Sequence, residues 1–139
     1  MSPAREVLAI DIDEVAADTV TTGFSRDVPV MRDARWVLQD LAGRFEIIFA
    51  TSTMDHPGSM HDRYLWLRES FPFIPTRSYV FCGSKQFVRA DYLIDDNPRN
   101  LEIFPGHGIL FTARHNTSET RFDRVYSWRD VHRYLAAVL

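Results

Sequence analysis

Short apolar runs that end in polar residues recur along this chain. Four of them are nearly continuous rather than alternating: residues Val7 to Ile12, Phe45 to Ala50, Tyr92 to Ile94 and Ile109 to Phe111. A strand of a parallel sheet that is covered on both faces has this pattern. We therefore expect four buried, parallel strands.

Apolar residues spaced by three and four positions predict helices between and after these strands. The expected helices are Val30 to Leu41, with Gly43 as a stop signal, Ser59 to Phe71, which Pro72 ends, and Arg129 to Val138. Strands that alternate with helices favour an α/β fold with a mainly parallel sheet covered on both faces. The active site of such a fold lies beyond the carboxyl ends of its strands.

Size and composition agree with one globular domain over residues 1–139, since 45% of the residues are hydrophobic and 25% are charged. The formal net charge is -3, with acids and bases interleaved, so no stable nucleic-acid complex is expected. No apolar run approaches the roughly 20 residues of a membrane span, and the N-terminus lacks a signal-peptide pattern. Because Cys82 is the only cysteine, an internal disulfide and a four-cysteine zinc site are excluded. A cytoplasmic protein outside the membrane is expected.

Two pairs of acids follow two of the predicted strands. Asp11 and Asp13 are separated by one residue, so their side chains point to the same side of an extended chain, and Asp95 and Asp96 end a later strand. Either pair alone is common in turns. Both pairs at the mouth of one sheet would repel each other strongly, and a hard divalent cation relieves such repulsion. Magnesium is favoured because it is held by few carboxylates and leaves room for a phosphate.

Hydroxyl groups and a lysine lie between the two acid pairs in the sequence. Thr51 and Ser52 follow the second strand and offer hydroxyl and N–H groups to a phosphate oxygen, and Lys85 lies ten residues before Asp95. Each feature alone is ordinary, because Ser and Thr are frequent in turns and most lysines are solvated. Their order along the chain is what indicates phosphate chemistry.

This order resembles the four motifs of the haloacid dehalogenase superfamily. The motifs are here Asp11-Ile12-Asp13-Glu14-Val15, Thr51-Ser52, Lys85 and Asp95-Asp96. A closer likeness, over most of the chain, is to the 5′(3′)-deoxyribonucleotidase family. It rests on Phe49-Ala50-Thr51-Ser52, Tyr64-Leu65-Trp66-Leu67, Ala90-Asp91-Tyr92-Leu93-Ile94-Asp95-Asp96, Leu110-Phe111-Thr112, His115-Asn116 and Tyr126-Ser127-Trp128.

The resemblance implies a three-layer Rossmann-like core and a magnesium-dependent phosphomonoesterase that acts through an aspartyl-phosphate, with a nucleoside monophosphate as its substrate. Asp11 would be the nucleophile, and Asp13 would protonate the leaving oxygen and then activate water. Thr51, Ser52 and Lys85 would bind the phosphoryl oxygens. Mg²⁺ would be held by Asp11, Asp95 and the Asp13 carbonyl, with Asp96 orienting these ligands.

Two features depart from the family pattern. Glu14 stands where these nucleotidases usually have glycine, and a negative charge there would disfavour a phosphate unless it points away. Only 16 residues separate Asp13 from Val30, so the cap domain that capped relatives insert there is minimal or missing. The long polar connection of residues 18–29 lies where a lid would be useful, and its Phe24 is expected to pack on its own domain. An uncapped site either accepts bulky substrates or is covered by another subunit of a homo-oligomer.

Other readings stay open at the level of the sequence. The substrate could instead be a sugar phosphate, a modified nucleotide of a biosynthetic pathway or a phosphorylated macromolecule. A receiver-like phosphoacceptor also clusters acids, but here the second strand ends in Thr51-Ser52 instead of an aspartate. A phosphate-binding module without turnover is the remaining alternative. Further residues carry weaker expectations: substrate contacts for Arg99, Arg114 and His115, a buried Cys82, and core positions for Trp36, Trp66 and Trp128.

Overall fold

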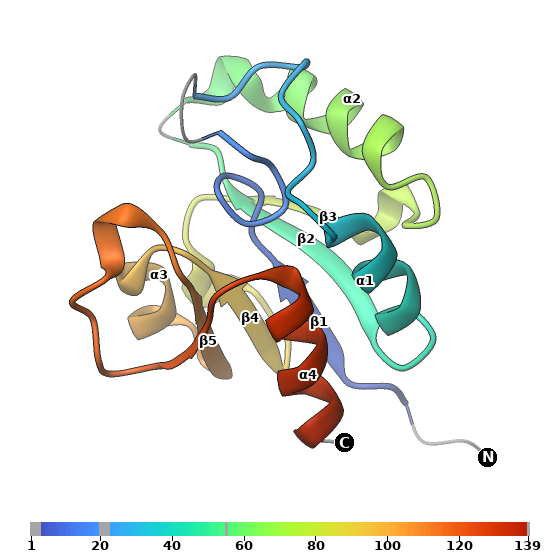
Figure 1. The fold of residues 1–139 in the computed structure, drawn as a ribbon. Helices are drawn as coiled ribbons and strands as arrows, with labels where there is room; N and C mark the ends of the chain where they lie inside the picture. Colours follow the sequence, from blue (N-terminus) through green and yellow to red (C-terminus); the bar gives the residue numbers. More distant parts are fainter. Residues whose placement is uncertain (1–3, 20–22, 55, 139) are drawn as a thin grey trace.

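A six-stranded parallel sheet forms the centre of the computed structural model, which describes residues 4–19, 23–54 and 56–138 (Figure 1). Its strand order is β3-β2-β1-β4-β5-β6, and every neighbouring pair is parallel. The strands are β1 Val7–Ile10, β2 Glu46–Ser52, β3 Tyr79–Cys82, β4 Tyr92–Asp95, β5 His107–Phe111 and β6 Asp123–Val125. The prediction of an α/β fold with a parallel sheet is thus confirmed.

Helices cover both faces of this sheet. The α-helices are α1 Ala34–Leu41, α2 Met60–Ser70, α3 Pro98–Ile103 and α4 Trp128–Val138, and the 3-10 helices are η1 Pro57–Ser59, η2 Thr76–Ser78, η3 Lys85–Phe87 and η4 Arg114–Asn116. One cluster of buried apolar residues joins α1, α2 and α4 to one face of the sheet, and a smaller cluster joins α3 and the end of η3 to the other face. Three layers result, as expected. No helix in the described part of the chain has the length and apolar character needed to cross a bilayer.

Several local predictions were incomplete or wrong. β3, β6 and α3 were not predicted. β6 has three residues and α3 has six, whereas β3, Tyr79–Cys82, is a continuous apolar run that is half-buried along its whole length. Helix α1 begins at Ala34 instead of Val30, since Asp33 has a left-handed backbone (φ 66°) that cannot continue a helix. Trp66 and Trp128 are buried as predicted, whereas Trp36 is 45% exposed. Its indole N–H reaches the carboxylate of Asp33 at the edge of α1, which keeps the ring at the surface.

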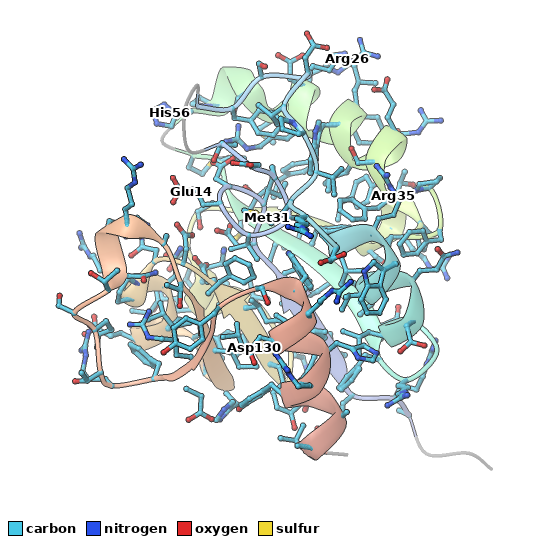
Figure 2. All side chains as sticks on the ribbon, in the orientation of Figure 1. Glu14, Arg26, Met31, Arg35, His56 and Asp130 are labelled. Carbon is cyan, nitrogen blue, oxygen red and sulfur yellow. The ribbon has the colours of Figure 1, made fainter. Side chains whose placement is uncertain are left out.

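The connection between β1 and α1 lies along α2, as Figure 1 shows in blue. Its described residues, 11–19 and 23–33, form two isolated bridges and contain no helix, so no cap domain stands over the sheet there. The indole N–H of Trp66 donates to the Val28 carbonyl over 2.8 Å, and the Phe24 ring meets Trp66 edge-on. Phe24 is therefore packed on its own domain, as expected. Arg26 of the connection, labelled in Figure 2, forms an ion pair with Glu69 of α2.

The close approach of two backbone segments gives a prediction about stability. A Cβ at Gly106 would lie 2.7 Å from the Ala90 carbonyl oxygen and 2.8 Å from that of Asp91. Because backbone carbonyls cannot move aside cheaply, Gly106→Ala should lower the free energy of unfolding by about 1–3 kcal/mol in urea denaturation. Gly58→Ala is the matched control, since its Cβ would meet nothing within 4 Å. An equal effect in both variants would contradict the steric explanation.

Candidate active site

The centre of the sheet brings the two acid pairs together. β1 is the central strand, with β2 on one side and β4 on the other, so the chain direction across the sheet reverses at this point. In parallel sheets such a reversal leaves a crevice at the carboxyl ends of the strands. Asp11 follows β1, and its N–H donates to the Ile94 carbonyl of β4 over 3.0 Å. Oxygens of Asp11, Asp95 and Asp96 consequently lie within 4.8 Å of one another.

Lys85 is buried between two of these carboxylates. Its Nζ lies 2.7 Å from Asp95 Oδ2 and 3.3 Å from Asp11 Oδ1, and the side chain has no exposed surface. Lys85 begins the short helix η3, and the Ser84 hydroxyl before it accepts a hydrogen bond from the N–H of Gln86. Lys85 is also the only lysine among the 16 Lys and Arg residues of the chain. A single ammonium group thus faces the whole acid cluster.

Asp95 and Asp96 are held by further polar groups. Asp95 Oδ1 accepts from the N–H of Asn97, and its Oδ2 accepts from the Asn100 amide over 3.0 Å. Asp96 Oδ2 lies 2.8 Å from His115 Nε2, and the Asn116 amide donates to the Asp96 carbonyl. These bonds fix the direction of both carboxylates. The segment after β5 therefore supports the end of β4.

The charges in this cluster do not balance. Burial raises the pKa of Asp11 well above its ordinary value, and the negative charge of Asp95 raises it further. Burial and the same neighbour raise the pKa of Asp96 to about 8. Burial would lower the pKa of Lys85, but the carboxylates of Asp11 and Asp95 outweigh that effect and hold the pKa above its usual range. One ammonium group is thus too little positive charge for three neighbouring carboxylates.

A hard divalent cation fits this imbalance. The candidate donors of Asp11, Asp95 and Asp96 are all carboxylate oxygens. Oxygen donors suit Mg²⁺ or Ca²⁺, whereas zinc and copper prefer nitrogen and sulfur ligands. A cation there would also favour the ionised form of Asp11 and Asp96. The residues present therefore fit the predicted magnesium ion.

Hydroxyl groups from the end of β2 border the same crevice. Thr51 is buried in β2, which neighbours β1. The hydroxyl oxygens of Ser52 and Thr53 are buried and have no hydrogen-bond partner among the described residues. Buried hydroxyls without partners are costly, so they are typical of a place that a ligand completes. Thr51, Ser52 and Lys85 stand where the sequence predicted a phosphate site; their roles stay predictions.

Glu14 lies in the bend after β1, beside the carboxyl ends of the strands (Figure 2). Its backbone is left-handed (φ 59°), and its Oε2 lies 3.6 Å from His115 Nε2. The carboxylate of Glu14 is thus drawn toward the segment after β5. It still adds a negative charge to the edge of the acid cluster. The pKa of Asp96 is raised mainly by burial and by the charge of Asp95, and the charge of Glu14 raises it further.

This geometry predicts two separable effects of replacing Glu14. Glu14→Gly should raise the free energy of unfolding by about 1 kcal/mol, because glycine adopts positive φ without the steric cost of a Cβ. It should also lower the KM for a phosphate monoester about two- to fivefold, because one repelling charge is gone. Glu14→Gln is the control: it should lower KM equally but leave stability unimproved. A KM that changes in neither variant would contradict the electrostatic part.

Some residues near the site were not predicted, and the expected substrate contacts of Arg99 and Arg114 stay predictions. Arg63 of α2 donates to Asp13 over 2.6 Å; its place on the buried face with Leu67 and Ser70 was the available signal. Arg99 and Arg114 are exposed, and none of the described contacts joins either side chain to the acid cluster. Cys82, expected to be buried, is half-buried at the end of β3. Asn100 and Asn116 gave no local signal, because asparagines are common in loops.

Two curated relatives match much of the chain. A curated putative 5′(3′)-deoxyribonucleotidase of Staphylococcus epidermidis is 47% identical over 138 residues, which are 99% of this chain and 74% of that protein. The 5′(3′)-deoxyribonucleotidase of Bacillus subtilis is 41% identical over 110 residues, 79% of this chain and 64% of that protein. The chain is thus shorter than both relatives.

Solved structures show the same fold at low sequence identity. The structure of D,D-heptose 1,7-bisphosphate phosphatase from B. bronchiseptica, complexed with magnesium and phosphate, superposes with a TM-score of 0.68. Only 11% of the residues are identical, and the match covers 96% of this chain and 99% of that one. This likeness confirms the expected three-layer, Rossmann-like fold.

A family model extends over most of the chain. Residues 19–138 match the model described as 5′ nucleotidase, deoxy (pyrimidine), cytosolic type C protein. The match includes the ends of β2 and β4, the buried Lys85 and the segment after β5. The chain therefore belongs to the deoxy (pyrimidine) 5′-nucleotidase type C family, a family of phosphoric monoester hydrolases with the haloacid dehalogenase fold.

Proposed function

We propose that this protein is a magnesium-dependent phosphomonoesterase that dephosphorylates nucleoside monophosphates through an aspartyl-phosphate on Asp11. The observation that carries the proposal is the position of Asp11. Its buried carboxylate lies at the carboxyl end of the central strand, 3.3 Å from the ammonium group of Lys85. Thr51 and Ser52 lie at the end of β2, the neighbour of β1. A nucleophile and a cation thus meet at the edge of the sheet where this strand with its hydroxyl groups also ends.

In the first step a carboxylate oxygen of Asp11 attacks the phosphorus atom in line with the ester oxygen. A bond forms from Asp11 to phosphorus as the phosphorus–ester bond breaks, and the electron pair of that bond leaves with the nucleoside oxygen. Asp13 gives its proton to this oxygen. Lys85 and the N–H and hydroxyl groups of Thr51 and Ser52 hold the phosphoryl oxygens while their charge redistributes.

In the second step Asp13, now ionised, takes a proton from a water molecule that attacks the aspartyl-phosphate. The bond between phosphorus and Asp11 breaks, inorganic phosphate leaves, and both carboxyl groups return to their starting states. Splitting hydrolysis in this way replaces one difficult displacement by two easier ones. The same residue can serve as acid and then as base because it stays beside the reacting oxygen in both steps.

Asp11, Asp95 and the Asp13 carbonyl would hold the magnesium ion, and Asp96 would orient them from its bonds to His115 and Asn116. Bound there, magnesium would neutralise charge on the phosphoryl group and keep Asp11 ionised. Lys85 remains the one basic side chain that bridges Asp11 and Asp95. It would therefore keep the two carboxylates in place between turnovers.

The substrate class comes from the relatives, whose names specify deoxyribonucleotides. We infer a nucleoside 5′- or 3′-monophosphate for this chain as well. The connection of residues 11–33 offers no cap over the crevice in its described part, so base selection would depend on the edges of the core or on a second copy. Sugar phosphates, modified nucleotides and phosphorylated macromolecules are the alternatives that a substrate panel separates.

The proposal is tested by phosphate release from a panel of nucleoside 5′- and 3′-monophosphates, with ribose and deoxyribose, and of sugar phosphates. Each reaction is run with magnesium and with a chelator. Release that requires magnesium and is fastest with a nucleotide would support both parts of the proposal. Faster release from a sugar phosphate would replace the substrate class. No release from any compound, including 4-nitrophenyl phosphate, would overturn the phosphatase itself.

A further inference from the structure

Arg63 reaches from α2 to the acid that the proposed reaction uses for proton transfer. Its Nη2 donates to Asp13 Oδ2 over 2.6 Å. The other oxygen of Asp13, Oδ1, has no hydrogen-bond partner among the described residues. Arg63 is accordingly the side chain that sets the orientation of the Asp13 carboxylate.

The two partners differ in exposure. The side chain of Arg63 is 7% exposed, whereas that of Asp13 is 45% exposed. The guanidinium therefore holds the carboxylate from the protein side, while part of the Asp13 side chain reaches solvent, although its Oδ1 is buried. This arrangement suits a group that acts through Asp13 instead of touching the phosphate itself.

Arg63 is itself held by contacts with Ser59 and Phe24. Its Nη1 donates to the Ser59 hydroxyl over 2.5 Å, and its Cζ lies 4.2 Å from the centre of the Phe24 ring. Phe24 in turn packs edge-on against Trp66. Arginine is well suited to this position, because its planar group stacks on an aromatic ring while its N–H groups donate in the plane. The contacts fix the guanidinium before any substrate binds.

We propose that Arg63 is the positioning residue of Asp13, and that it links the Phe24 segment to the proton-transfer step. The proposal rests on the function proposed above. Proton transfer by a placed side chain contributes roughly 10²–10⁴-fold to a rate, and small displacements lose much of that gain. Loss of Arg63 should therefore lower the rate of hydrolysis most for substrates whose leaving oxygen needs a proton.

The test compares two leaving groups in the same variant. A nucleoside leaves as a strongly basic alkoxide and needs the proton, whereas 4-nitrophenolate leaves without it. In Arg63→Gln, kcat/KM for a nucleoside monophosphate should fall about 30-fold, and for 4-nitrophenyl phosphate less than fivefold. kcat/KM is the proper quantity, because it reports only the steps up to formation of the aspartyl-phosphate. Arg63→Lys, which keeps a cation and a donor, should recover part of the nucleotide activity.

Controls separate this role from a purely structural one. Arg68→Gln removes an exposed cation of the same helix that lies over the Tyr64 ring and that none of the described contacts joins to Asp13. It should leave both kcat/KM values within twofold. Equal losses with the two substrates in Arg63→Gln, or no loss, would overturn the positioning role. If that variant does not fold, Arg63→Lys gives the same comparison of substrates. A wild-type protein inactive on both compounds would instead refute the proposed function.

Discussion

Asp11→Asn is expected to abolish turnover, lowering kcat for a nucleoside monophosphate by roughly 10⁴-fold or more, the scale seen when a nucleophile is removed. The amide that replaces the carboxylate has no anionic oxygen to attack phosphorus, so no aspartyl-phosphate forms. The measurement is phosphate release at saturating substrate and magnesium. Rapid acid quench of the wild type with ³²P-labelled substrate should trap label on the protein, and Asp11→Asn should trap none.

The loss in this variant should not come from unfolding. Burial and neighbouring charge raise the pKa of Asp11, which means that its ionised form is unfavourable in the folded protein without a cation. Replacing it by a neutral side chain of the same shape removes that repulsion. In the presence of a chelator the melting temperature of Asp11→Asn should therefore equal or exceed that of the wild type. Residual turnover within tenfold of the wild type would show that Asp11 is not the nucleophile.

The arrangement of the sheet could be predicted from the sequence because the central strands are covered on both faces. β1 and β4 are continuous apolar runs for this reason. Because these two strands pair in parallel, the acids that follow them lie at the same edge of the sheet. Edge elements carry a weaker signal. β6 has one apolar residue among three, and the short α3 begins at Pro98, which reads equally well as a turn. β3 is the exception, because Tyr79–Cys82 is a continuous apolar run whose signal was available.

The candidate site shows the same division. Asp11 and Asp95 could be predicted because each ends a buried apolar run, and Lys85 because its order with them along the chain resembles a family. The partners of Arg63 and His115 could not, since the contacts span long separations: Arg63 contacts Asp13, 50 positions away, and His115 contacts Asp96, 19 positions away. Side-chain packing decides such contacts, and no local pattern records it. The catalytic roles and the cytoplasmic location stay predictions.

Lys85→Met should make the folding of the protein depend on magnesium. Lys85 has no exposed surface and bridges Asp11 and Asp95, so its removal leaves buried carboxylates together without a counterion. Breaking such a pair costs roughly 3–5 kcal/mol, because an uncompensated charge stays buried. In urea denaturation with a chelator, the free energy of unfolding of Lys85→Met should fall by about that amount. kcat/KM with magnesium should also fall roughly 10²–10³-fold, as expected when a group that stabilises transition-state charge is lost.

Magnesium should recover much of the stability but little of the activity. A ligand at 100 times its dissociation constant stabilises the folded state by about 2.7 kcal/mol, and here it would also supply the missing positive charge. It cannot replace the ammonium donor to the phosphoryl oxygen. The double variant Lys85→Met/Asp95→Asn is the matched control: with one carboxylate fewer, it should be more stable in chelator than Lys85→Met alone. Because Lys85 is the only lysine, amine-reactive labelling reads its burial directly, and Lys85 of the folded wild type should stay unlabelled. A Lys85→Met protein as stable in chelator as the wild type would contradict the view that this one ammonium group holds the acid cluster together.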